Sequence, residues 1–219
     1  MVADPPAHGH VYAARVVDLS SLLEDPIGHL AHRDQEVRRL AVSVCAAAAD
    51  ARWFDPLVTV LVTDTSPRVR AEAAEVLAAF GPAAETVLLA RRAAEAEPIV
   101  VEAIVTALGE LESRAAVEWL AGLARSADDR IVREAAVAAL GAVGDPAALP
   151  VLLEAVTSAP PQVRRRAVVA LTAFDEPEAE AAIAGARDDR NPMVREVAEM
   201  IVGRVVPEWQ PVEPSDEGH

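Results

Sequence analysis

The stretch DDRIVREAAVAALG (residues 128–141) recurs in modified form along the chain of 219 residues. Its most regular feature is a valine followed by an arginine, found at Val37-Arg38, Val69-Arg70, Val132-Arg133, Val163-Arg164 and Val194-Arg195. A sixth copy, third in chain order, is Val100-Val101 and replaces the arginine. Successive copies lie 32, 31, 32, 31 and 31 residues apart. A fixed period of this length predicts stacked supersecondary units, each in contact only with its neighbours.

The residues that follow each valine predict an amphipathic helix. Counted from the valine, positions +4 and +8 are small or apolar in every copy. Position +4 holds Ala41, Ala73, Ile104, Ala136, Ala167 and Ala198, and position +8 holds Cys45, Leu77, Leu108, Leu140, Leu171 and Val202. Together with positions 0, +7 and +11 they fall within an arc of about 100°, the width of a buried helical stripe. The small residue at +4 also predicts a close approach by a neighbouring helix.

A shorter apolar segment precedes the later copies of this helix. These segments span residues 57–62, 84–89, 116–123, 148–156 and 178–184, and several follow an acidic residue or glycine and a proline, which is a helix-start signal. Turn-forming residues separate the two helices at 64–67, 127–129, 158–161 and 188–192. Each unit is therefore predicted to be a helix, a tight turn and a longer helix. Strands are not expected, because no segment shows sustained alternation with a period of two.

The pattern divides the chain into three parts. We expect a flexible N-terminal tail at 1–16, the repeat array at 17–205 and a proline-rich acidic C-terminal tail at 206–219. Terminal units expose one face that inner units bury. Leu19, Leu22 and Leu23 are predicted to cap the first unit. Trp209 has two interpretations, a cap folded over the last unit or an exposed anchor for a partner.

The recurring stretch resembles HEAT repeats, most closely the short bacterial kind first associated with phycobilisome lyases. The resemblance extends over about six units. It implies an all-α, right-handed α-solenoid in which the first helices form the convex surface and the second helices line a concave one. The resemblance implies little about activity, because the shared motif is the packing motif.

Composition and charge argue against several classes of partner. The net charge is −15 and the pI about 4.7, which disfavours binding to nucleic acid or to an anionic membrane surface. Some DNA glycosylases use HEAT-like repeats with a basic concave surface, whereas the corresponding surface predicted here is acidic. The sequence shows no secretory signal and no long apolar run, so a cytoplasmic location is expected.

The arginines of the valine–arginine pairs form a predicted structural ladder: Arg38, Arg70, Arg133, Arg164 and Arg195. Each lies at the edge of the buried stripe, where we expect its guanidinium to bond carboxylates or carbonyls of the turns, such as those of Asp34, Asp64 or Asp129. A row of anion-binding groups is the alternative. Because Val101 breaks the ladder, the joint after the third unit is predicted to be held more weakly.

The helix face opposite the stripe is the predicted partner-binding surface. Its candidate residues come from positions +2 and +6: Arg39, Glu75, Glu102, Thr106, Glu134, Arg165, Val169 and Glu196. The centre of this surface is acidic and arginines flank it. We therefore predict a non-catalytic protein–protein interaction scaffold that binds a basic or amphipathic segment. An ordinary solvated face is the alternative interpretation.

Catalytic and cofactor chemistry finds little support in the sequence. His29 and His32 are spaced to share a helix face, but two histidines do not make a zinc site, and no metal is predicted. The sequence lacks the His-Glu pairs that supply the iron ligands of HEAT-like deoxyhypusine hydroxylases. Cys45 occupies a core position rather than that of a nucleophile. The resemblance leaves one enzymatic alternative, a subunit of a HEAT-repeat enzyme such as a bilin lyase. No cofactor is predicted for the chain itself.

Overall fold

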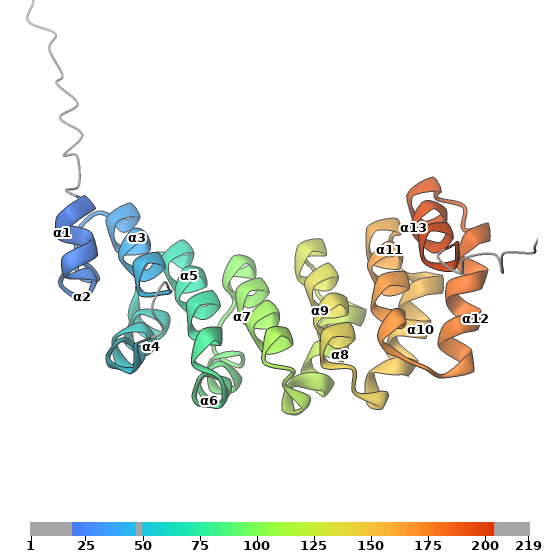
Figure 1. Ribbon diagram of the computed structural model, residues 1–219, viewed down its shortest axis with the longest axis horizontal. Helices are drawn as coiled ribbons and strands as arrows, with labels where there is room; N and C mark the ends of the chain where they lie inside the picture. The colour runs from blue at the N-terminus through green and yellow to red at the C-terminus, as the bar shows by residue number, and fades with distance from the viewer. Residues whose placement is uncertain (1–18, 47–49, 204–219) are drawn as a thin grey trace, which may run out of the picture.

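The computed structural model describes residues 19–46 and 50–203, and within these ranges all regular structure is helical. The predicted tails at 1–16 and 206–219, with Trp209, lie outside the described residues. Thirteen α-helices in the described part form an elongated row from α1 to α13 (Figure 1). The all-α solenoid predicted from the period is thus confirmed.

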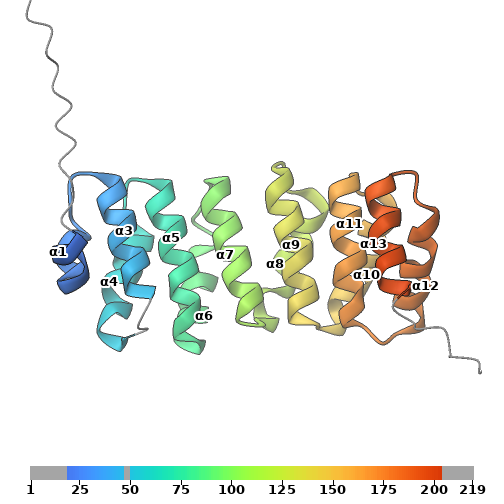
Figure 2. The same ribbon diagram turned by 45° about the horizontal axis from the view of Figure 1, so that its top comes forward.

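The helices form two layers. The second helices of the six units are α3 (Gln35–Ala46), α5 (Pro67–Leu77), α7 (Pro98–Glu110), α9 (Arg130–Val143), α11 (Pro161–Ala170) and α13 (Pro192–Val202). The first helices are α4 (Phe54–Thr63), α6 (Pro82–Arg91), α8 (Val117–Ser126), α10 (Leu149–Ser158) and α12 (Pro177–Gly185), with the short α1 (Leu19–Glu24) and α2 (Pro26–His29) before α3. Figures 1 and 2 show the second helices side by side in one layer. None of the described helices has both the length and the apolar character needed to cross a membrane.

Short 3₁₀ turns join or extend these helices. They are η1 (Ala51–Trp53), η2 (Ala78–Phe80), η3 (Arg114–Ala116), η4 (Pro146–Ala148), η5 (Leu171–Ala173) and η6 (Ala186–Asp188).

Helix starts follow the sequence signals. Proline is the first residue of α5, α6, α7, α11, α12 and α13, where its missing N–H leaves no bond unmade. The Asp129 carboxylate caps α9 by accepting from the backbone N–H groups of Ile131 and Val132.

The predicted stripe is buried along the whole array. The valine of each pair is at most 3% exposed, and the alanine or isoleucine at +4 is fully buried in all six units. Leu77, Leu108, Leu140 and Leu171 at +8 are also fully buried. Except for Val37, Ala41 and Val132, these residues belong to one continuous apolar core that runs between the two layers. Its burial is the main force that holds neighbouring units together.

Two glycines set the spacing of the second helices. A Cβ added at Gly109 of α7 would lie 2.9 Å from the Cα of Ala139 in α9. A Cβ added at Gly141 of α9 would lie 2.7 Å from the Cα of Ala170 in α11. The second helices accordingly contact one another more extensively than the first helices do. This is the arrangement expected on the inner side of a curved stack.

The N-terminal end differs from the prediction. Of the three leucines expected to cap the first unit, only Leu22 is buried, at 1% exposure. Leu19 and Leu23 are 64% and 66% exposed. The cause is that α1 has only six residues and contacts α2 and α3 along one edge, so a single leucine reaches the core.

Candidate functional site

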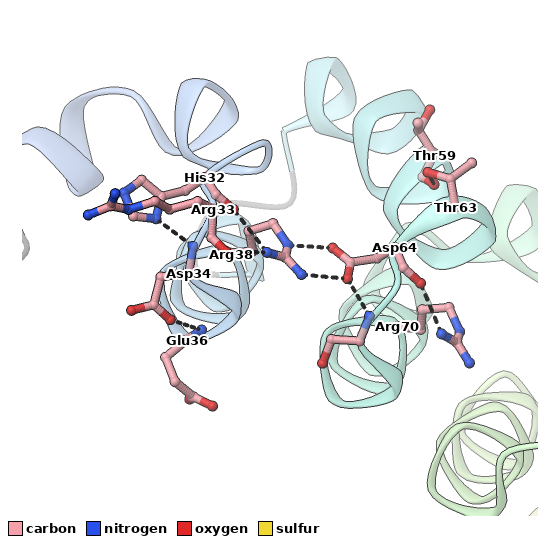
Figure 3. A network of polar contacts seen from close by, with 10 residues as sticks. His32, Arg33, Asp34, Glu36, Arg38, Thr59, Thr63, Asp64 and Arg70 are labelled. Atoms are coloured by element: carbon pink, nitrogen blue, oxygen red, sulfur yellow. Dashed lines mark hydrogen bonds and ion pairs between the residues drawn. The ribbon is translucent and has the colours of Figure 1, made fainter.

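The arginines of the ladder bridge adjacent units through the turns. Arg38 of α3 donates from Nε and Nη2 to the two carboxylate oxygens of Asp64, at 2.7 and 2.9 Å (Figure 3). Its Nη1 donates to the carbonyl of His32, in the turn of its own unit, at 2.9 Å. The carbonyl of Asp64 in turn accepts from Nη1 of Arg70 at 2.9 Å. Asp64 therefore accepts hydrogen bonds from an arginine of the preceding unit and from an arginine of its own unit.

Two further joints have the same arrangement. Arg70 forms a bidentate pair with Glu95, with both distances 3.0 Å. Arg164, only 1% exposed, forms a bidentate pair with Asp189 at 2.8 and 2.7 Å and donates to the carbonyl of Ala159 at 2.8 Å. Such planar fork-to-carboxylate contacts fix orientation as well as distance.

The paired carboxylates have altered acidity. Burial raises the pKa of Glu95, but hydrogen bonds from Arg70 and Arg91 outweigh it and lower the pKa to about 2. For Asp189, the hydrogen bond from Arg164 is the main cause of a lowered pKa. These acids stay ionised at neutral pH, so the joints carry full charges on both partners.

The ladder is incomplete in the middle of the array. At the joint of units three and four, Val101 replaces the arginine, and the turn position equivalent to Asp64 is Ala127. At the next joint Arg133 is present and donates to the carbonyl of Ala127, but no described carboxylate pairs with it. Of the acceptors expected from the sequence, only Asp64 bonds the ladder. Asp34 and Asp129 instead accept from backbone N–H groups at the starts of α3 and α9, where helix capping takes their oxygens.

Three of the predicted partner-binding residues line one cleft. The surface formed by the second helices, here called the second-helix face, contains a cleft of about 360 Å³ between α7 and α9. Glu102 and Thr106 line it from α7 and Glu134 from α9. The remaining lining residues are Gly109, Glu110, Ile131, Ala135, Ala138, Ala139, Ala142 and Arg166. Alanine and glycine occupy five of the eleven lining positions, which leaves room between the two helices.

Acidic side chains gather around this cleft. Burial raises the pKa of Glu75 in α5, and the charges of Glu72, Glu102 and Glu110 raise it further. We call Glu72, Glu75, Glu102, Glu110 and Glu134 the acidic patch. Among the described residues, Glu75, Glu102 and Glu110 have no ion pair. The charges of Glu72, Glu102 and Glu110 disfavour ionisation of Glu75, in addition to the larger effect of burial.

The other predicted site residues, Glu75 among them, do not line the cleft. Arg39 pairs with Glu36 and Glu72 at 3.2 and 3.1 Å, so its charge is already neutralised within the protein. Arg165, Val169 and Glu196 are exposed on α11 and α13 and do not line it.

The sequence interpretation missed Glu110, Ile131 and Ala135 as cleft residues. On α9 the missed positions are −1 and +3, which share one edge of the helix with +10, occupied by Ala142. That edge faces the preceding unit, and its spacing of four and seven residues is a signal that the sequence carried. On α7, Glu110 continues the row begun by Glu102 and Thr106.

The histidines and the cysteine have local roles. His29 contacts the carbonyl of Asp25 through Nδ1 at 2.7 Å, and Nδ1 of His32 accepts from the backbone N–H of Asp34 at 3.1 Å. In the described part of the chain no three acidic, histidine or cysteine side chains are grouped as metal ligands. Cys45 is fully buried in the core, and this burial raises the pKa of its thiol.

Comparison with known proteins identifies the class. Residues 25–104 and 85–169, together more than half of the chain, match the sequence pattern of HEAT repeats. The chain therefore belongs to the HEAT-repeat family. No curated protein matches it in sequence.

Solved structures of several repeat proteins share the fold. CpcE and CpcF of phycocyanin lyase from Nostoc sp. PCC7120 give a TM-score of 0.61 at 20% identity, over 90% of this chain and 79% of that one. YibA of Escherichia coli gives 0.60 at 14% identity, over 82% and 70%. A designed armadillo repeat protein in complex with the peptide (KR)4 gives 0.54 at 19% identity, over 83% and 98%. At these identities the similarity shows the fold alone.

Proposed function

We propose that this protein is a scaffold that binds a protein segment on its second-helix face, with a basic side chain seated in the cleft between α7 and α9. One observation carries the proposal. Glu102 and Glu110 line a cleft together with small apolar side chains, and neither they nor the neighbouring Glu75 has an ion pair among the described residues.

The cleft suits an arginine or lysine of an amphipathic segment. The alkyl stem of such a side chain would cover Ala135 and Ala138, and its cationic head would lie among Glu102, Glu110 and Glu134. Ile131, 57% exposed at the edge of the cleft, offers a contact for an apolar residue of the same segment. Binding of this kind requires complementary shape and charge rather than a reaction.

The charges around the cleft indicate how the bound segment would lie across the second helices. Arg166 lines the cleft from α11, and Arg165 is exposed on the same helix. A segment with its basic residues over α5 to α9 and acidic or neutral residues over α11 would match both charges. The structure of the designed armadillo protein with a (KR)4 peptide shows that a related fold accepts a basic peptide.

Charge reversal separates this site from the overall acidity of the protein. The double variant Glu102→Arg/Glu134→Arg changes the acidic patch, and Glu118→Arg/Glu180→Arg makes the same change in charge on exposed residues of the first-helix layer. We expect the first variant to bind a fluorescent (KR)4 peptide at least tenfold more weakly, a loss of about 1.4 kcal/mol. The control should stay within about threefold of the wild type. Equal losses in both would show that net charge alone attracts the peptide.

The resemblance to phycocyanin lyase supports an alternative, a subunit of a bilin lyase. Visible absorbance of the purified protein distinguishes the two proposals, because a tightly held bilin is coloured. A visible band that copurifies with the protein would favour the lyase subunit. A colourless protein that binds basic peptides through Glu102 and Glu134 would favour the scaffold.

A further inference from the structure

The turn after α10 lacks the acidic residue that, at other joints, pairs with the ladder arginine of the preceding unit. Ala159 ends α10 in an extended conformation (φ −74°, ψ 168°), as Asp64 ends α4 (φ −65°, ψ 135°). The carbonyl of Ala159 accepts from Arg164 at 2.8 Å, just as the carbonyl of Asp64 accepts from Arg70. Ala159 is therefore the structural equivalent of Asp64, with a methyl group in place of the carboxylate that receives the arginine of the preceding unit.

Arg133 is the arginine left without that carboxylate. Its Nε donates to the carbonyl of Ala127, so the side chain is anchored to the turn of its own unit. Its two terminal nitrogens, Nη1 and Nη2, have no hydrogen-bond partner among residues 19–46 and 50–203. Arg38, Arg70 and Arg164 each hold a carboxylate with Nε and Nη2. In Arg133 the Nε is already bonded, so Nη1 and Nη2 are the pair of donors that a carboxylate could use.

A cavity of about 130 Å³ lies where the missing carboxylate would stand. Arg133 and Ala159 both line it, together with Arg125, Glu154 and Ser158. Arg125 already pairs with Glu154 at 2.9 Å, and the hydroxyl of Ser158 donates to the Glu154 carbonyl at 2.8 Å. Arg133 and Arg125 are thus the cations of this cavity, and Arg133 is the one without a carboxylate partner among the described residues.

We infer that this cavity, here called the Arg133 cavity, binds a carboxylate supplied by a ligand. The ligand oxygens would accept from Nη1 and Nη2 of Arg133, in place of the acid present at the equivalent turns. A planar carboxylate matches the guanidinium fork, and the small volume admits little beyond the carboxylate and its adjoining carbon. The cavity is formed by α8, α9, α10 and the following turn, so it is separate from the cleft that α7, α9 and α11 line, and the inference does not depend on the proposed function.

The chain offers variants that fill or remove the site. Ala159→Asp places a carboxylate where Asp64 and Asp189 have theirs and should fill the site from within. Arg133→Gln removes the fork. Ala159→Asn has nearly the same shape as the aspartate variant but no charge, so it should compete with a ligand carboxylate for Arg133 much less than the aspartate does.

Nuclear magnetic resonance of the arginine Nε–Hε groups in the full chain tests the inference. Titration with sodium acetate, against sodium chloride at the same ionic strength, should shift the Arg133 signal saturably in the millimolar range. The shift should be at least tenfold weaker in Ala159→Asp and should remain in Ala159→Asn. The Arg133→Gln variant identifies the signal by its loss. An acetate response of Arg133 no larger than that with chloride, or one unchanged in Ala159→Asp, would overturn the inference.

A second probe distinguishes the sources of the carboxylate. N-acetyl-aspartate N-methylamide presents the acid as a protein side chain does, and its asparagine analogue is the neutral control. Tighter binding of the aspartate compound than of acetate supports an acidic side chain of a partner protein. Equal binding supports a free small carboxylate. Binding of the asparagine analogue as strong as that of the aspartate compound contradicts a carboxylate site.

Discussion

Replacing Glu95 with glutamine removes a buried charge on which two arginines converge. The side chain of Glu95 is 3% exposed and accepts from Arg70 at 3.0 Å through both oxygens and from Arg91 at 2.7 Å. The backbone N–H groups of Ala96 and Glu97 donate to it as well. Glutamine retains one acceptor oxygen but loses the charge, which leaves both guanidinium groups without an anion.

The pKa of Glu95 gives the expected size of the effect. A fall from 4.5 to about 2 corresponds to about 3 kcal/mol of stabilisation of the ionised form in the folded state. Because glutamine keeps part of the hydrogen bonding, we expect a loss of about 2–3 kcal/mol at pH 7. Urea unfolding followed by far-ultraviolet circular dichroism measures this loss.

The same charge predicts a pH dependence. The folded pKa lies below the unfolded one, so the stabilisation is fully present well above pH 4.5 and is lost as the pH falls towards 2. The wild type should lose about 0.4 kcal/mol from this group at pH 4.5 and about 1.4 kcal/mol at pH 3.5. The Glu95→Gln variant lacks that dependence, so the difference between the two proteins should shrink on acidification.

Glu97→Gln is the matched control, because Glu97 is exposed and lies only two residues away. It should change stability by no more than about 0.5 kcal/mol. Equal losses in the two variants, or a Glu95→Gln difference that does not decline between pH 7 and 3.5, would refute the reasoning about the buried ion pairs.

Three further predictions concern packing, the joint at the third unit and the thiol. Gly141→Ala should destabilise the protein by about 1–2 kcal/mol, because overpacking against α11 exceeds the gain in helix propensity. Gly122→Ala, which has open space around it, should stabilise the protein by about 0.5–1 kcal/mol. Chemical unfolding of the two variants measures both effects. Val101→Arg combined with Ala127→Asp should rebuild the ladder and exceed the sum of the single changes by about 1 kcal/mol in a double-mutant cycle. A cycle without coupling would contradict the assignment of these positions. Cys45 should react with a thiol reagent only after unfolding, because burial raises the pKa of its thiol, and rapid labelling of the folded protein would contradict its place in the core.

The sequence predicted the helices well because their signals are local. The stripe from Val132 to Leu140 specifies both a helix and its buried side, and the proline at the start of α12 marks its first residue. Burial then follows from the spacing alone. The weaker result at Leu19 and Leu23 has a related cause, since among the described residues no unit precedes α1 to define its buried side.

Contacts between units were harder to predict than the units themselves. The angle of a residue around its own helix indicated that Glu102, Thr106 and Glu134 face away from the core, and they share a cleft. It did not indicate that Arg39 of α3 would pair with Glu72 of α5, because this contact depends on the offset between neighbouring second helices. Glu95 was missed as an arginine partner although it lies five residues before Val100, as Asp64 lies five residues before Val69, so the sequence carried that signal.

The ladder also bears on how repeat arrays of this kind gain and lose units. At three junctions an arginine is matched to an acid 25 or 26 residues further along the chain, so recombination between them separates a donor from its acceptor. The two central junctions carry no such pair among the described residues. Insertion of a unit at either of these junctions, or deletion of the fourth unit with α8 and α9, would therefore break no ion pair of the ladder, which makes the centre of the array the most tolerant place for a change in its length.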